Sequence, residues 1–164
     1  QEGSDVRRIV TGKLANKVAL ISGGATGMGG AASRLFAAEG AKVGILDINA
    51  KAGAEAVADI ERAGGTACFV QSDVSRADEV KRAVDEVSAK LGPITVLFNH
   101  AGSIVIKPFL ETTEEEWDRL TDINVKSMFL VTKAVLPQMI AAGGGSIVCT
   151  SSISAVAGTP MEVL

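Results

Sequence analysis

A glycine-rich turn near the start of the chain is the first segment that could do chemistry. It reads Ser-Gly-Gly-Ala-Thr-Gly-Met-Gly over residues 22–29, between a short apolar run and a stretch of helical composition. Glycines at such a turn let the backbone bend sharply and approach a pyrophosphate, to which the first N–H groups of the helix donate. This context favours phosphate binding over a turn that is glycine-rich for packing reasons alone.

An acidic residue follows the turn at the distance expected for a ribose contact. Asp47 ends the second apolar run, 47 − 29 = 18 residues after the last glycine. A carboxylate there can accept hydrogen bonds from a ribose diol and would repel a 2′-phosphate. No Arg or Lys lies in the turn or between Asp47 and Lys51, which favours NAD over NADP. The alternative is a solvated acid at a strand end.

The elements that must position these residues are short apolar runs that alternate with longer amphipathic stretches. Strands are predicted at 17–22, 42–46, 66–71, 94–99 and 146–149, and helices from the turn to about 39 and at 50–62, 75–90 and 113–140. This alternation predicts parallel βαβ units, and the continuous apolar runs predict a sheet covered on both faces. We therefore expect an α/β fold with a doubly wound parallel sheet in the order 3-2-1-4-5.

Polar residues mark where two of these helices begin. Ser75 is predicted to be the N-cap of the third helix. Thr113 and Glu116 have the spacing of a capping box at the start of the last helix. Pro137 lies near the end of that helix, where we expect it to kink or loosen the backbone.

Composition excludes several classes of protein. The 164 residues fit one domain, 47% of them are hydrophobic, and the net charge of 16 − 19 = −3 argues against a nucleic-acid partner. No apolar run reaches the roughly 18 residues of a membrane span, and residues 1–13 do not resemble a signal peptide. Cys68 and Cys149 form no CxxC motif, so we expect two buried thiols in a cytoplasmic protein and no metal site.

The glycine turn departs from the tighter Gly-x-Gly-x-x-Gly spacing, and its form resembles that of the short-chain dehydrogenase/reductase family. Three further stretches carry the resemblance. Asn-His-Ala-Gly at 99–102 stands where the family has Asn-Asn-Ala-Gly, Asn124 lies in Ile-Asn-Val, and Ser151-Ser152 follows the fifth strand. The resemblance covers the chain from about Leu14 onward. It implies an NAD-binding Rossmann domain over 14–164, incomplete at its C-terminus, after an N-terminal extension over 1–13.

The family resemblance implies a set of cofactor contacts. The glycine turn would hold the pyrophosphate, Asp47 the adenosine ribose, Asp73-Val74 the adenine edge, and the end of the fourth strand the nicotinamide side. The implied cofactor-binding residues are Ser22, Gly23, Thr26, Gly27, Met28, Gly29, Asp47, Ile48, Asp73, Val74, Asn99, His100, Ala101 and Gly102. The alternative for Asp73 is a cap on the turn before Ser75. His100 could be interpreted as a general base, but the resemblance implies a loop residue that takes no part in proton transfer.

The resemblance also implies a catalytic group of Asn, Ser, Tyr and Lys. The tyrosine exchanges a proton with the substrate oxygen, the lysine lowers the pKa of the tyrosine, and the serine stabilises charge on that oxygen. Asn124, which would anchor a water relay, and Ser152 fill two of these roles, although a serine there could simply cap the strand end. The chain has no tyrosine, and the family spacing places one directly after Leu164. We therefore expect the sequence to continue and the 164 residues alone to be inactive.

These observations lead to one main hypothesis and two alternatives. The main hypothesis is an NAD(H)-dependent oxidoreductase that interconverts a small secondary alcohol and a ketone, with no membrane partner. We expect a homo-oligomer, a dimer or tetramer, that assembles partly through 113–140. One alternative is a non-catalytic dinucleotide-binding fragment or assembly partner. The other is a methyltransferase, which gives no reason for the motif at 99–102. We further expect Ile147 and Val148 to be wet if the sheet stops at the fifth strand.

Overall fold

A sheet of five parallel strands forms the centre of the computed structural model, which describes residues 12–161. The strands are β1 (Val18–Ser22), β2 (Lys42–Asp47), β3 (Thr66–Gln71), β4 (Val96–Asn99) and β5 (Ser146–Cys149). Their order is β3-β2-β1-β4-β5, and every neighbouring pair is parallel. The predicted doubly wound sheet is therefore confirmed. Most of the predicted extension over 1–13 lies outside the described residues.

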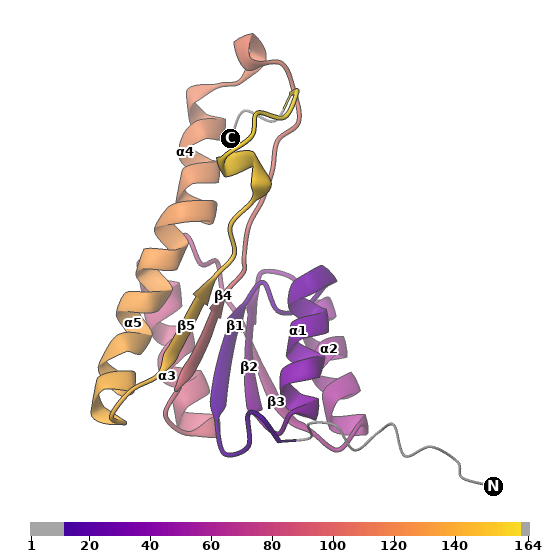
Figure 1. The fold of residues 1–164 in the computed structure, drawn as a ribbon, viewed down its shortest axis with the longest axis vertical. Helices are drawn as coiled ribbons and strands as arrows, with labels where there is room; N and C mark the ends of the chain where they lie inside the picture. The colour runs from indigo at the N-terminus through magenta and orange to yellow at the C-terminus, as the bar shows by residue number, and fades with distance from the viewer. Residues whose placement is uncertain (1–11, 162–164) are drawn as a thin grey trace, which may run out of the picture.

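Helices cover both faces of this sheet (Figure 1). Helices α1 (Gly27–Ala38) and α2 (Ala50–Arg62) lie on one face, and α3 (Ala77–Leu91) and α5 (Ser127–Ala141) lie on the other. Helix α4 (Glu114–Thr121) runs through the π-helical segment η2 (Asp122–Lys126) into α5 and rises beyond the carboxyl edge of the strands. Two short 3-10 turns, η1 (Phe109–Glu111) and η3 (Ile153–Ala155), lie beyond the same edge. Across residues 12–161, no helix is long and apolar enough to span a bilayer.

Strand β1 shows why its sequence is continuously apolar. Val18 and Leu20 belong to the core on the α3 and α5 side, whereas Ala19 and Ile21 belong to the core on the α1 and α2 side. All four are buried. Successive side chains of a strand point to opposite faces, so a strand that is covered twice must be apolar at every position. This burial anchors the central strand, and the glycine turn begins at its end.

The two predicted helix starts have different outcomes. The capping box at α4 is confirmed, because the Thr113 hydroxyl accepts a hydrogen bond from the Glu116 N–H at 3.2 Å and the Glu116 carboxylate accepts one from the Thr113 N–H at 3.0 Å. The prediction for Ser75 is wrong, because Arg76 occupies the N-cap position of α3. Ser75 instead donates its hydroxyl to the Asp73 carboxylate at 2.7 Å.

Among residues 12–161, strand β5 lies at an edge of the sheet and pairs with β4 alone. Ile147 is 39% exposed and Val148 is 51% exposed, as predicted for an uncovered fifth strand. Cys149 is exposed on the same strand, so the prediction of two buried thiols is wrong for this residue. Cys68 is half-buried on β3, where burial raises the pKa of its thiol. The last helix continues past Pro137 to its end at Ala141.

Candidate functional site

The carboxyl ends of the strands bring the predicted site residues to one edge of the sheet. A cavity of about 450 Å³ opens there. The predicted residues that line it are Gly23, Thr26, Gly27, Met28, Asp47, Ile48, Asp73, Val74, His100, Ala101 and Gly102. A second cavity of about 640 Å³ continues toward β5 and is lined by both Asn124 and Ser152. Met28 and residues 100–103 line both cavities, so the two form a continuous site.

The start of α1 is an open end of positive potential in the wall of the first cavity. Thr26 occupies the N-cap position, but its side chain makes no capping hydrogen bond, and the first turn holds no acid. The first N–H groups of a helix have no intrahelical acceptor and carry a partial positive charge. Gly27 has a φ of +54°, and a Cβ added there would meet nothing within 4 Å. The backbone is therefore accessible to an anion, which fits a phosphate group.

Three predicted residues lie beneath the cavities and not in their walls. Ser22 is buried, and its hydroxyl accepts hydrogen bonds from the N–H groups of His100 at 3.0 Å and Ala101 at 3.2 Å. Gly29 is buried, and a Cβ added there would lie 2.0 Å from the carbonyl oxygen of Gly23. Asn99 is buried, and its amide donates to the Thr132 hydroxyl of α5 at 3.0 Å. These residues hold the site together from below.

The Asp47 carboxylate is fixed in place by two backbone N–H groups. One oxygen accepts from Ala25 at 3.2 Å and the other from Asn49 at 3.0 Å. Each carboxylate oxygen can accept a further hydrogen bond, so the side chain keeps acceptor capacity toward the cavity. The predicted ribose contact remains a prediction, and the structure supplies a held carboxylate for it.

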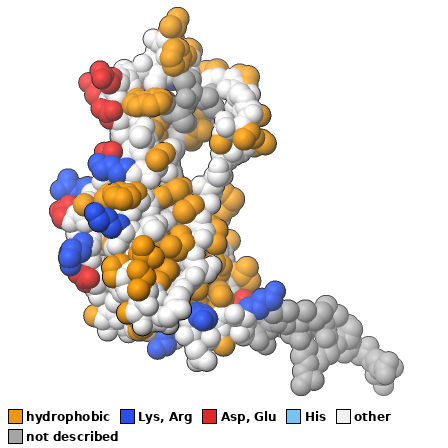
Figure 2. All heavy atoms as spheres, turned by 60° about the vertical axis from the view of Figure 1, so that its left-hand side comes forward, with side chains coloured by type: hydrophobic (Ala, Val, Ile, Leu, Met, Phe, Trp, Pro, Cys, Tyr) orange, Lys and Arg blue, Asp and Glu red, His pale blue; other side chains and the backbone are white. Residues whose placement is uncertain are grey.

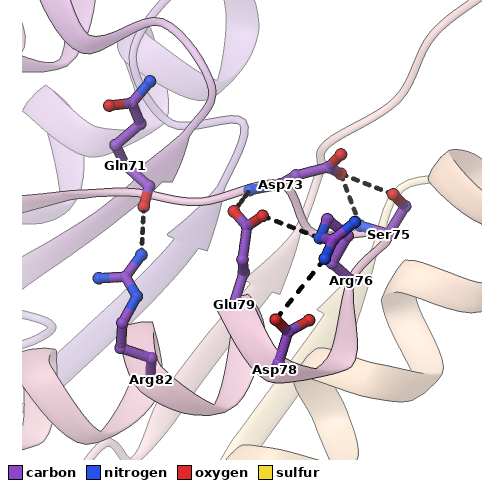
Figure 3. Close-up of polar contacts among 7 residues, drawn as sticks. All are labelled: Gln71, Asp73, Ser75, Arg76, Asp78, Glu79 and Arg82. Atoms are coloured by element: carbon purple, nitrogen blue, oxygen red, sulfur yellow. Dashed lines mark hydrogen bonds and ion pairs between the residues drawn. The ribbon is translucent and has the colours of Figure 1, made fainter.

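A network of polar contacts holds the loop between β3 and α3 (Figure 3). The Asp73 carboxylate accepts hydrogen bonds from the N–H of Ser75 at 2.9 Å and from its hydroxyl at 2.7 Å. The Asp73 N–H donates to the Glu79 carboxylate at 2.8 Å, and Arg76 pairs with that carboxylate at 3.0 Å. Asp73 therefore does cap the turn before Ser75, with one oxygen. Its other oxygen stays available for the predicted adenine contact.

Asn124 ties the π-helical segment to the loop after β4. Its side-chain oxygen accepts from the Ser103 N–H at 2.8 Å, and its amide donates to the Ser103 carbonyl at 2.9 Å. A side chain that completes both backbone hydrogen bonds of one residue fixes that loop tightly. π-Helical turns occur frequently at functional sites. The predicted water relay at Asn124 remains a prediction, and the structure shows a positioning contact.

Ser152 is exposed at the far side of the second cavity. Its hydroxyl oxygen accepts a hydrogen bond from the Ser154 N–H at 3.1 Å, so Ser152 also caps the short turn η3. A serine hydroxyl that accepts one hydrogen bond still has its own O–H to donate. The cap and a role toward a substrate oxygen are therefore compatible.

Sequence reasoning missed several residues that the fold brings to the site. Arg119 and Ile123 line the first cavity from α4 and η2, although Arg119 lies 119 − 47 = 72 residues after Asp47. The sequence has no Arg or Lys between Asp47 and Lys51, but Arg119 lines the same cavity as Asp47. The sequence holds no signal for these two residues, because no motif relates Arg119 or Ile123 to Asp47.

An ion pair holds the loop after β4 against α4. Lys107 pairs with Glu116, and both side chains are about a quarter exposed. The Lys107 ammonium, together with the Thr113 N–H, holds the pKa of the Glu116 carboxyl below its usual value. The Lys107 N–H also donates to the Met161 carbonyl at 2.9 Å. Lys107 thus links the loop to α4 through its side chain and to the segment after β5 through its backbone.

Comparison with known proteins shows the same family throughout. The model of the short chain dehydrogenase family matches residues 17–164. Cyclopentanol dehydrogenase of Comamonas testosteroni is 44% identical over 149 residues, which are 91% of this chain and 60% of that protein. The 3-alpha-(or 20-beta)-hydroxysteroid dehydrogenase of Mycobacterium tuberculosis is 41% identical over 153 residues, 92% of this chain and 56% of that protein. The chain thus spans about 60% of the length of these relatives.

A solved structure is similar in three dimensions. The hydroxysteroid dehydrogenase from Escherichia coli superposes with a TM-score of 0.80 and is 34% identical in sequence. The match covers 83% of this chain and 57% of that one. The similarity therefore extends over most of the described fold.

Replacing Glu79 with Ala should loosen the loop that carries Asp73. The Asp73 N–H then loses a charged acceptor, and a hydrogen bond to a charged group contributes about 1.5–3 kcal/mol. We expect the exchange of the Asp73 amide hydrogen to accelerate roughly 10-fold or more, as measured by NMR. Asp85→Ala is the matched control, because Asp85 pairs with Lys81 on the same helix away from the loop. Equal exchange rates in the two folded variants would contradict the assigned contact.

Proposed function

The chain belongs to the short-chain dehydrogenase family, and from this premise we propose that the protein is an NAD(H)-dependent oxidoreductase that interconverts a secondary alcohol and a ketone. One observation carries the proposal. The uncapped start of α1 and the held carboxylate of Asp47 face one cavity, and that cavity continues into a second one lined by Ser152. An uncapped helix start, a held carboxylate and a serine hydroxyl thus line connected cavities, which supports roles toward a phosphate, a ribose and a substrate oxygen.

Several groups of this chain fit the parts of a dinucleotide. The N–H groups at the start of α1 would hold the pyrophosphate, and Asp47 would accept from the adenosine ribose. The free oxygen of Asp73 and the N–H of Val74 would meet the adenine edge. NAD is favoured over NADP because the Asp47 carboxylate would repel a 2′-phosphate. Arg119 is a basic residue in the lining of the same cavity, but it lies exposed on α4 and not beside Asp47 in the sequence.

The chemistry divides between the cofactor and the chain. The nicotinamide ring supplies the hydride acceptor or donor when it is bound. Ser152 would donate its O–H to the substrate oxygen and stabilise the charge that develops there. Asn124 would hold the loop at Ser103 that borders the second cavity. The tyrosine and lysine that exchange the proton in this family are not among the 164 residues in the family's arrangement, so the proposal requires them from sequence outside this range.

The second cavity suggests the class of substrate. Its lining includes the apolar side chains of Ile104, Val125 and Met128 near Ser152. Similar proteins are named for cyclopentanol and for hydroxysteroids, both alicyclic alcohols. We therefore propose that the substrate is an alicyclic secondary alcohol or the corresponding ketone.

The outer face of α5 supports a homo-oligomer, either a dimer or a tetramer. Phe129, Leu136 and Ile140 are 60%, 41% and 70% exposed. Figure 2 shows hydrophobic side chains gathered on this side of the molecule. A contiguous apolar surface of this kind marks an association site. We propose that α4 and α5 of two copies pack against each other.

The proposed activity is tested with the protein expressed from its complete reading frame. We expect NADH binding by calorimetry, and formation of NADH when NAD⁺ and cyclopentanol are added. Binding without turnover of any alicyclic alcohol would favour the non-catalytic alternative. Binding of S-adenosylmethionine with no binding of NADH would contradict the family's chemistry here.

Replacing Asp47 should change the choice between NAD and NADP. Asp47→Ala removes the acceptor for the ribose diol, so the Kd of NADH should rise roughly 10-fold or more. Asp47→Asn keeps an oxygen acceptor and removes the charge, so NADPH binding should improve while NADH binding falls less. Both Kd values are measured by calorimetry, with Asp59→Ala on α2 as the control. An unchanged ratio of the two Kd values would argue against the ribose contact.

Replacing Ser152 should reduce turnover without weakening the binding of the cofactor. Ser152→Ala removes the hydroxyl that stabilises charge on the substrate oxygen, so kcat should fall roughly 100- to 1000-fold. The Kd of NADH should stay the same, because Ser152 lies outside the first cavity. Ser151→Ala is the matched control and should keep most of the activity. If the control loses more activity than Ser152→Ala, the catalytic serine is Ser151.

A further inference from the structure

His100 lies where the two cavities meet. It is half-buried at the end of β4 and lines both cavities. Its Nδ1 lies 2.9 Å from the hydroxyl of Thr150, which follows β5. Its ring lies against that of Phe98, with the centroids 5.1 Å apart. Nδ1 is therefore engaged by a protein hydroxyl.

The ring also contacts the start of α1. A Cβ added at Gly29 would lie 2.8 Å from Cδ2 of His100, so the imidazole lies directly over the first turn of that helix. The His100 N–H donates to the Ser22 hydroxyl at the end of β1. One residue therefore contacts the helix start, the end of β1 and the segment after β5.

Two hydrogen bonds hold the segment after β5 at its first residue, Thr150. All four residues of β5 are exposed, and among the described residues this strand pairs with β4 alone. Beyond Cys149 the Thr150 N–H donates to the Asn99 carbonyl at 2.9 Å, and the His100–Thr150 hydrogen bond comes at the same point. Ser152 follows two residues later, so its place depends on how Thr150 is held.

We propose that His100 is a positioning residue, whose hydrogen bond to Thr150 fixes the Ser152 segment relative to the first turn of α1. The inference rests on the proposed function, in which Ser152 donates a hydrogen bond to a substrate that lies between the segment after β5 and the first turn of α1. Only a correctly placed hydroxyl lowers the barrier, and a shift of about 1 Å can reduce the rate by roughly 100-fold. His100 thus acts on turnover through geometry and not through its charge.

Side-chain geometry separates the hydrogen bond from the ring contact. The Nδ1 of histidine and the amide atoms of asparagine are both bonded to Cγ, so His100→Asn can reach Thr150 but lacks the outer ring. His100→Phe keeps a ring against Phe98 and has no nitrogen. On the partner side, Thr150→Val keeps the shape without the hydroxyl, and Thr150→Ser keeps the hydroxyl. The four variants form two matched pairs.

The test is a double-mutant cycle in the protein expressed from its complete reading frame. The readouts are kcat and KM with cyclopentanol, the Kd of NADH and the Tm. We expect His100→Phe and Thr150→Val each to lower kcat roughly 10- to 100-fold. For Thr150→Val the Kd of NADH should stay within about 2-fold, because Thr150 lies outside the first cavity. The double variant should be no slower than either single variant, because both remove the same hydrogen bond. His100→Asn and Thr150→Ser should retain most of the kcat.

Specific outcomes overturn the inference. Multiplicative losses in the double variant, or a His100→Asn enzyme as slow as His100→Phe, would show that the hydrogen bond is not what matters. A common loss of Tm and of NADH binding would show a purely structural role. If His100→Phe does not fold, the Thr150→Val and Thr150→Ser pair decides, since Thr150 lies at a half-buried strand end. If the wild type is active and the variants keep its kcat, this inference alone is refuted. If the wild type itself is inactive, the proposed function is refuted together with the inference.

Discussion

The close approach of the glycine turn to the end of β4 is the contact on which the rest of the site depends. A Cβ at Gly23 would lie 2.8 Å from the Cα of Ala101, and one at Gly29 would meet both the Gly23 carbonyl and the His100 ring. Real Cβ atoms do not tolerate such distances, so only glycine lets these backbones meet. Because they meet, the start of α1 and residues 100–103 border the same two cavities. The register of β1 against β4, which pairs Ser22 with Asn99, delivers both segments to that point.

The fold could be predicted from the sequence because its signals are local and repeated. Each buried strand needs apolar residues on both faces, so the runs at β1 and β2 are visible without knowing their partners. The regular βα alternation and the handedness of its crossovers restrict the order of the strands to a few doubly wound topologies, and 3-2-1-4-5 is one of the common ones. Helix ends are less regular. Ser75 has the composition of an N-cap, but the Asp73 carboxylate two residues earlier competes for it, and the helix starts at Ala77 instead.

The site was predictable only where a motif lies in one short stretch. The turn at 22–29, Asp47 and Ser152 could be proposed because the family's motifs include them, and the structure places the turn and Asp47 at the first cavity and Ser152 at the second. Arg119 could not, since nothing along the chain relates it to Asp47. The sequence also does not distinguish residues that line the cavities from residues that are buried beneath them. Ser22, Gly29 and Asn99 belong to the same motifs as the residues that line the cavities, yet they are buried beneath them.

The π-helical segment between α4 and α5 has a consequence for how one long helix serves two tasks. A π turn holds one residue more than an α turn, and one residue corresponds to about 100° of rotation. The extra residue lets α5 direct Val131 and Val135 into the core while α4 and η2 direct Arg119 and Ile123 to the first cavity. An unbroken α-helix of the same sequence would turn one of these faces away. The π-helical turn at Asn124 therefore rotates α4 relative to α5, so that one continuous helix contributes side chains both to the core and to the site.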